Sequence, residues 1–120
     1  MTKPTRRHVL GIYGERLAAD YLISIGYEIL ERNWRCGIGE IDLIARDKDR
    51  WVFVEVKTRN AAGFGEPFES ITEEKLSRLR RLVGEWCRIR QVAGVQVRID
   101  AVSVLVDRGH VKLEHLKQVF

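Results

Sequence analysis

Three charged residues near the middle of the chain have the types and spacing to hydrolyse a phosphate ester. Asp42 lies in the run G-E-I-D-L-I-A, and Glu55 and Lys57 lie in the run F-V-E-V-K-T-R. Two neighbouring carboxylates suit Mg²⁺, with Mn²⁺ as a substitute, because Mg²⁺ is often held by one or two carboxylates, waters and substrate phosphates. A lysine beside them would orient water or stabilise charge developing on phosphorus. We therefore predict Asp42, Glu55 and Lys57 as catalytic residues.

A β-hairpin would have to position these residues. In residues 39–59, apolar and polar residues alternate on both sides of a polar, aspartate-rich segment. This pattern is typical of two strands joined by a turn. The turn is predicted at residues 47–50, centred between Lys48 and Asp49.

The register of this hairpin would gather the charged side chains. Asp42 would lie opposite Glu55, and Glu40 would lie opposite Lys57. Because side chains two positions apart share one face of a strand, these four would lie on the same face. The other face would carry the apolar side chains of Ile41, Leu43, Val52, Val54 and Val56. Asp42 and Glu55 would then be close enough to bind one cation.

Two facing carboxylates are costly in a hairpin that has only a structural role. Like charges opposite one another destabilise a sheet, and burial increases the cost. A cation between Asp42 and Glu55 would relieve the repulsion. The alternative is a solvent-facing strand with ordinary surface charges, in which Glu40 and Lys57 form a weak ion pair.

The same residues resemble a known family. Asp42 followed by Glu55, Val56 and Lys57 resembles the D…(D/E)-x-K signature of the PD-(D/E)xK nuclease superfamily. The two longer runs around these residues are similar to those of the small bacterial YraN family, whose members are similar to archaeal Holliday-junction resolvases. One departure is Ile41, which stands where the name of the superfamily has proline.

The resemblance implies an α/β fold with an αβββαβ restriction-endonuclease-like core, in which helices flank a mixed sheet. It also implies a metal-dependent nuclease. In the related resolvases a glutamate on the first helix reaches the metal site, so Glu15 resembles a third acidic ligand; the alternative is a solvated helix residue. Glu40 is the other candidate for completing the metal site, and Lys75 resembles a position near it.

Composition is compatible with a single domain over residues 1–120, whose first eight residues could form a flexible basic arm. The chain is 45% hydrophobic and 32% charged, which is ordinary for a globular protein. Its net charge of +4 is compatible with a nucleic-acid partner. Cys36 and Cys87 lack metal-ligand spacing and are predicted to be free thiols in a reducing cytoplasm. No apolar run has transmembrane length, so we expect a cytoplasmic protein without a membrane partner.

Periodicity predicts the elements that flank the hairpin. A helix is expected over residues 9–25, ended by Gly26, and a strand over residues 27–35. The apolar stripe of this helix is Leu10, Gly14, Leu17, Tyr21 and Ile25. A capping box at residues 70–73 would begin a second helix that runs to about Gln91. Its apolar stripe is Leu76, Leu79, Val83 and Trp86.

A last strand is expected over residues 95–106, with a turn at residues 107–110 into residues 111–116. The helix between the third and fourth strands makes those strands parallel and completes an α/β/α sandwich. Asp100 is predicted to be structural, and His110 and His115 to be surface residues.

Basic residues near the predicted site are candidates for nucleic-acid binding. Arg59 and Phe64 lie in an expected loop over residues 59–68 and could contact a backbone and a base, although the loop could equally be a structural connection. Lys75, Arg78 and Arg81 lie on the second helix outside its apolar stripe, where they would bind phosphates or form a solvated face.

The residues therefore predict a Mg²⁺-dependent endonuclease that hydrolyses DNA, with branched or junction DNA as the implied substrate. The alternatives are a DNA-binding module with a nuclease fold and no activity, and a structural partner protein. A homodimer is compatible with each of these three functions.

Overall fold

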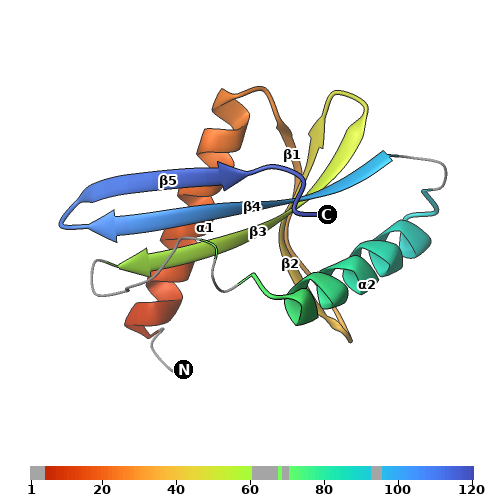
Figure 1. Cartoon of the computed structure of the whole chain (residues 1–120), viewed down its shortest axis with the longest axis horizontal. Helices are drawn as coiled ribbons and strands as arrows, with labels where there is room; N and C mark the ends of the chain where they lie inside the picture. The colour runs from red at the N-terminus through yellow and green to blue at the C-terminus, as the bar shows by residue number, and fades with distance from the viewer. Residues whose placement is uncertain (1–4, 61–67, 69–70, 93–95) are drawn as a thin grey trace.

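The structure, a computed structural model, describes residues 5–60, 68, 71–92 and 96–120 (Figure 1). Its elements in chain order are α1 (Arg6–Ser24), β1 (Glu28–Cys36), β2 (Gly39–Asp47), β3 (Arg50–Asn60), α2 (Glu73–Ile89), β4 (Gln96–Asp107) and β5 (His110–Leu116). The predicted order is confirmed, and the segment expected after the turn at residues 107–110 forms the fifth strand, β5.

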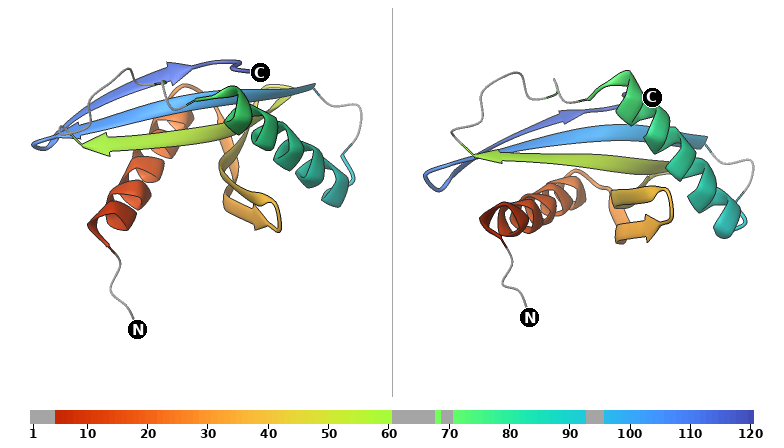
Figure 2. Two further views of the ribbon diagram at one scale, coloured as in Figure 1. Left: turned by 60° about the horizontal axis from the view of Figure 1, so that its bottom comes forward. Right: turned by 90° about the horizontal axis from the view of Figure 1, so that it is seen from below.

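The five strands form one mixed sheet in the order β1-β2-β3-β4-β5. β3 and β4 are parallel, as expected from the helix between them, and the other neighbours are antiparallel. Figure 2 shows α1 on one face of the sheet and α2 on the other. The prediction of a mixed α/β sheet flanked by helices is therefore correct.

Each helix covers its own hydrophobic core. The core under α1 contains Ala18, Ala19, Leu22, Tyr27, Leu43, Ala45, Val52, Val54, Val102 and Val104. The core under α2 contains Ile41, Ile44, Phe53, Leu79, Leu82, Val83, Trp86 and Ile99. The alternation along β3 matches its two-sided burial, because a valine on one face follows an aromatic residue on the other.

The predicted stripe of α1 is confirmed in part, since Gly14 is buried and Leu17 and Tyr21 pack against the core. Ala18, Ala19 and Leu22 are fully buried, whereas Ile25 is 43% exposed. The helix ends at Ser24, and Gly26 has a φ of +100°, so the chain turns away before Ile25 can pack under the helix.

The N-cap of α2 also differs. Thr72, not Ser70, caps the helix, because its side chain accepts a hydrogen bond from the N–H of Lys75. The predicted apolar stripe of α2 is otherwise confirmed, since Leu79, Val83 and Trp86 are buried.

The central hairpin has the predicted turn, and the predicted register is confirmed from Leu43–Val54 to Asp47–Arg50, whereas the predicted pair Asp42–Glu55 lies beyond the end of this ladder. Asp47 pairs with Arg50 and Leu43 pairs with Val54, which places the turn at Lys48 and Asp49.

The prediction that Ile41 and Leu43 share a face is wrong. Leu43 packs under α1 and Ile41 packs under α2. The reason is that β2 pairs with β3 only from Leu43 onward, while its earlier residues pair with β1 alone. That end of the β1–β2 hairpin stands away from the sheet (Figure 2).

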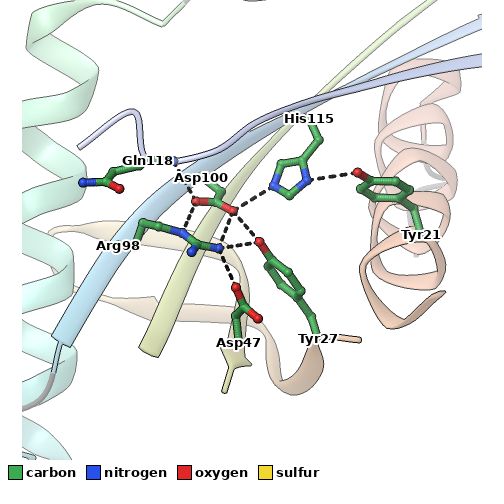
Figure 3. Close-up of polar contacts among 7 residues, drawn as sticks. All are labelled: Tyr21, Tyr27, Asp47, Arg98, Asp100, His115 and Gln118. Atoms are coloured by element: carbon green, nitrogen blue, oxygen red, sulfur yellow. Dashed lines mark hydrogen bonds and ion pairs between the residues drawn. The ribbon is translucent and has the colours of Figure 1, made fainter. Parts of the chain in front are cut away.

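A buried polar network holds the sheet to α1 on one side and to the C-terminal segment on the other (Figure 3). Asp100 is its centre: Arg98 Nε lies 2.8 Å from Asp100 Oδ1, and the N–H of Gln118 donates to the same oxygen over 3.0 Å. The hydroxyl of Tyr27 donates to Asp100 Oδ2 over 3.1 Å. The predicted structural role of Asp100 is compatible with this position.

The prediction that His115 is a surface residue is wrong. Its side chain is 5% exposed, with Nε2 2.8 Å from Asp100 Oδ2 and Nδ1 3.1 Å from the hydroxyl of Tyr21. Strand β5 places His115 opposite Val102 and therefore against the interior. His110, the first residue of β5, is exposed as predicted.

Candidate functional site

Asp42 and Glu55 lie together where β2 leaves β3. Oδ2 of Asp42 accepts a hydrogen bond from the N–H of Val56 over 2.8 Å, which holds the carboxylate against β3 beside Glu55. The β2–β3 ladder ends one pair earlier, at Leu43 and Val54. Beyond this pair, the Asp42 side chain, and not the backbone of β2, accepts the hydrogen bond from the Val56 N–H.

The pKa values of Asp42 and Glu55 are both raised, as expected for two carboxyls without a bound cation. Burial raises the pKa of Asp42, the Val56 N–H partly offsets this, and the charge of Glu40 raises the pKa further. Burial raises the pKa of Glu55, and the negative charge of Asp42 adds to this shift. Two buried carboxylates that each favour the protonated form are a place where a cation would be stabilised.

Glu15 is brought to the same site by a close helix–sheet contact. A Cβ built on Gly14 would lie 1.8 Å from Thr58 Oγ1, so only glycine permits α1 to approach β3 this closely. Burial and the charges of Asp42 and Glu40 raise the pKa of Glu15 to about 7. Its Oε1 is buried and has no hydrogen-bond partner among the described residues.

Asn33 is a site residue that the sequence analysis missed. It lies on β1 between the pairs Arg32–Leu43 and Trp34–Ile41, and therefore faces the position of Asp42. Its side chain hydrogen-bonds Glu15, which lowers the pKa of that residue. Its φ of 53° lies in the left-handed region, which asparagine tolerates better than most residues. An asparagine within a predicted strand is unusual, and this was the feature of the sequence that could have identified Asn33 as a site residue.

Glu40 does not pair with Lys57 as predicted. It pairs with Arg35 on β1, where Arg35 Nε lies 3.0 Å from Glu40 Oε2. This follows from the early departure of β2 from β3, which leaves β1 as the only described neighbour of Glu40 in the sheet. Glu40 still lies near the acidic pair, because its charge raises the pKa values of Asp42 and Glu55.

Lys57 lies on β3 two residues after Glu55, on the same face by strand alternation. The positive charges that act on Glu55, however, come from α2: Lys75 and Arg78 lower the pKa of that carboxyl. The sequence analysis placed Lys75 near the site by resemblance but assigned Arg78 only to nucleic-acid binding. The structure brings both to the acidic pair.

The other predicted nucleic-acid residues have mixed outcomes. Arg59 lies in β3, which continues to Asn60, so the expected loop cannot begin at Arg59. Phe64 lies outside the described residues. Arg81 is exposed on α2, one turn after Arg78.

The donor set fits a Mg²⁺ ion that is bound mainly by water and substrate. Within residues 5–60, 68, 71–92 and 96–120, no three His, Cys, Asp or Glu side chains form a group that could hold a metal ion. Mg²⁺ does not need such a cage, because one or two carboxylates and substrate phosphates commonly suffice. Asp42 and Glu55 supply hard oxygen ligands, and the orphaned Oε1 of Glu15 lies in the same acidic group.

A pocket of about 510 Å³ opens beside the acidic pair, between the first half of α1 and the β1–β2 hairpin. Glu15 and Glu40 lie in its wall together with Asn33 and Arg35. Asp42 and Glu55 are not among the residues that line it, and the link to the acidic pair is through the charges of Glu15 and Glu40, which act on Asp42.

The fold and the acidic pair define an α/β protein with a mixed sheet and a polar site where two of its strands diverge. The chain belongs to the family described as "Uncharacterised protein family UPF0102", whose model matches residues 14–104. The chain is similar to the UPF0102 protein of Beutenbergia cavernae, with 49% identity over 94% of this chain and 97% of the relative. It is also 50% identical to the UPF0102 protein of Nocardia farcinica, over 95% of this chain and 91% of the relative.

In the described part of the chain, no helix is long and apolar enough to cross a membrane. Cys36 and Cys87 are free thiols, as predicted.

Proposed function

We propose that this protein is a Mg²⁺-dependent endonuclease with a restriction-endonuclease-like core, which hydrolyses phosphodiester bonds in DNA. The observation that carries this proposal is the convergence of Asp42 and Glu55. Both side chains are half-buried, both carboxyls have raised pKa values, and one is held in place by the backbone of the strand that carries the other.

The surrounding cations support phosphate chemistry over a purely structural role. The positive charges of Lys75 and Arg78 on α2 lower the pKa of Glu55, and Lys57 follows Glu55 by two residues on β3. A structural carboxylate pair would be stabilised by a direct ion pair, as Asp100 is by Arg98 at 2.8 Å. Among the described residues, no salt bridge neutralises Asp42 or Glu55 in this way.

Asp42 and Glu55 would hold the metal, with Glu15 or Glu40 as the further candidate ligand. When bound, Mg²⁺ supplies Lewis-acid polarisation of the phosphate and a water of lowered pKa. Lys57 orients or deprotonates the attacking water, which forms the new P–O bond as the bond to the leaving oxygen breaks. Lys75 and Arg78 offset negative charge that develops on the phosphoryl oxygens.

Cleavage assays test this proposal directly. Purified protein is incubated with duplex, single-stranded, flap and four-way-junction DNA, with Mg²⁺, with Mn²⁺ and with chelator. Metal-dependent cutting that is lost in Asp42→Asn and kept in the exposed control Asp20→Asn is expected. Branched DNA is the proposed preferred substrate.

A non-catalytic DNA-binding module is the second candidate, because the described residues hold no complete metal cage. Salt-sensitive DNA binding without cutting under any metal condition would select this candidate and reject the nuclease.

A further inference from the structure

The pocket beside the acidic pair has the size of a ligand site. Its volume of about 510 Å³ falls within the range of roughly 300–1,000 Å³ that is typical of small-ligand pockets. A second pocket of about 220 Å³ adjoins it and shares Ile12, Glu15 and Asn33. The hollow therefore extends along α1.

The polar groups of this pocket suit the edge of a nucleobase. Asn33 offers an amide with both a donor and an acceptor, Arg35 offers a planar donor, and Glu40 offers acceptor oxygens. These are the side-chain types that read base edges through paired hydrogen bonds.

The same groups disfavour a phosphate in the pocket. Glu15 and Glu40 both lie in its wall, and Arg35 is already paired with Glu40 over 3.0 Å. Without a metal ion bound to them, these carboxylates would repel an anion, whereas they would not repel a neutral, flat ring with donors and acceptors.

Ile12 in the pocket wall, together with exposed side chains near it on α1, can replace base stacking. Val9, Ile12 and Tyr13 on α1 are 52%, 54% and 45% exposed. Ile12 lines both pockets, and the aromatic ring of Tyr13 follows it on the helix. A base in a duplex is stacked and has its pairing edge occupied, so only an unpaired or extruded base can reach such a recess. Apolar and aromatic side chains then supply the contacts that the base has lost.

We propose that the pocket between α1 and the β1–β2 hairpin binds an unpaired nucleotide next to the cleaved bond, with Asn33 and Arg35 reading its edge. The inference rests on the proposed nuclease function, because it places this nucleotide beside Asp42 and Glu55. It narrows the substrate class to DNA with an unpaired base at the cleavage site, which branched structures supply.

Binding without cleavage tests the pocket separately from the enzyme. Two DNA duplexes carry the fluorescent base 2-aminopurine, one in a single-nucleotide bulge and one paired with thymine, and both are titrated with protein in chelator. The bulged duplex is expected to bind about tenfold more tightly and to change its fluorescence on binding. Equal affinity for the two duplexes, with unchanged fluorescence, would overturn the inference.

Matched variants locate the effect. Asn33→Gly removes the amide but keeps the left-handed backbone, and Arg35→Ala removes an exposed guanidinium. Each should abolish the preference for the bulge and leave paired-duplex binding nearly unchanged. The control is Lys112→Ala on β5, because Lys112 is as exposed as Arg35 and is also ion-paired with a strand glutamate. If Arg35→Ala and Asn33→Gly both behave like Lys112→Ala, the pocket does not read a base.

The two proposals can fail separately. Metal-dependent cutting without a bulge preference would reject the pocket and keep the nuclease. A bulge preference that depends on Asn33, with no cutting under any metal condition, would keep the pocket and reject the nuclease.

Discussion

Gly14 of α1 lies directly against Thr58 of β3, so closely that a Cβ at residue 14 would be 1.8 Å from Thr58 Oγ1 and 2.7 Å from Thr58 Cβ. Thr58 follows Lys57, and Glu15 follows Gly14. This single contact therefore sets how near the helix carboxyl comes to the two strands that carry the acidic pair.

Gly14→Ala should displace α1 and lower the free energy of unfolding by about 1–3 kcal/mol through overpacking. The matched control is Gly11→Ala on the same helix, where an added Cβ would meet nothing within 4 Å. That change should be neutral or stabilising by up to about 1 kcal/mol, since alanine favours helix. Urea denaturation measures both. Equal effects of the two substitutions would mean that the Thr58 contact does not limit the packing of α1.

The acidic group should make the protein less stable as pH rises. Glu15, Asp42 and Glu55 have pKa values raised above their unfolded values, so the unfolded chain releases protons first. The contribution of these carboxyls to the free energy of unfolding is fully present below their pKa values in the unfolded chain. It is lost as pH rises through their pKa values in the folded protein, which for Glu15 is between about pH 4.5 and pH 7.

Asp42→Asn should flatten this profile in metal-free buffer and raise the free energy of unfolding at pH 8 by about 1–2 kcal/mol. The amide can still accept the hydrogen bond from Val56, which limits structural loss. Asp20→Asn, at an exposed position of α1, should leave the profile unchanged. Denaturation curves at several pH values check both variants, and parallel wild-type and Asp42→Asn profiles would contradict the assigned repulsion.

Divalent metal should stabilise the folded state by mass action. At a concentration a hundredfold above Kd, Mg²⁺ or Mn²⁺ should add about 2.7 kcal/mol and raise Tm, because only the folded chain holds Asp42 and Glu55 together. Asp42→Asn and Glu55→Gln should each remove the response, while Asp20→Asn should keep it. A calorimetric titration that stays flat with several divalent ions would speak against the metal site.

Lys57→Ala should separate catalysis from binding. It removes a charge from the reaction centre without removing a metal ligand, so the cleavage rate should fall about 100-fold or more. DNA affinity and the Tm response to metal should change little. A loss of cleavage no larger than that of Arg81→Ala would make Lys57 one basic contact among several.

Arg78 and Arg81 should differ although they lie one turn apart on α2. Arg81→Ala should weaken DNA binding and reduce the slope of log affinity against log salt concentration by about 1. Turnover at saturating DNA should be unchanged. Arg78→Ala should also slow turnover, because Arg78 faces Glu55. Single-turnover kinetics at several salt concentrations distinguish the two variants. Identical behaviour would remove Arg78 from the site.

The network around Asp100 should be structural. Arg98 is 7% exposed and depends on Asp100, with Asp47 as a second partner at 3.3 Å. Burial would raise the pKa of Asp100, but hydrogen bonds from His115, Arg98 and the Gln118 N–H lower it to about 2. Its stabilising effect is therefore present above its unfolded pKa and is lost only as pH falls toward 2.

Asp100→Asn should cost about 3–5 kcal/mol, because it leaves a buried guanidinium without its main partner. Asp107→Asn, at the exposed end of the same strand, should change stability by less than about 0.5 kcal/mol. Thermal unfolding measures both. Cleavage per folded molecule should be unchanged in Asp100→Asn, and its specific loss would move the network into the functional site.

The sequence by itself determined the features that depend on neighbours along the chain. The turn at Lys48 and Asp49, the register from Leu43 onward and the apolar stripe of α2 all follow from local periodicity and turn chemistry. The register was enough to predict that Asp42 and Glu55 would meet.

Only the tertiary structure decided which distant residues join that pair. Glu15 arrives because Gly14 lets α1 approach Thr58, and Asn33 arrives because β1 follows β2 away from the sheet. Arg78 reaches Glu55 through the placement of α2 across the opposite face. The burial of His115 and the separation of Ile41 from Leu43 have the same origin. Each of these features depends on packing between segments that are far apart in sequence. The periodicity of one strand specifies which face a side chain occupies, but it does not specify which other element covers that face.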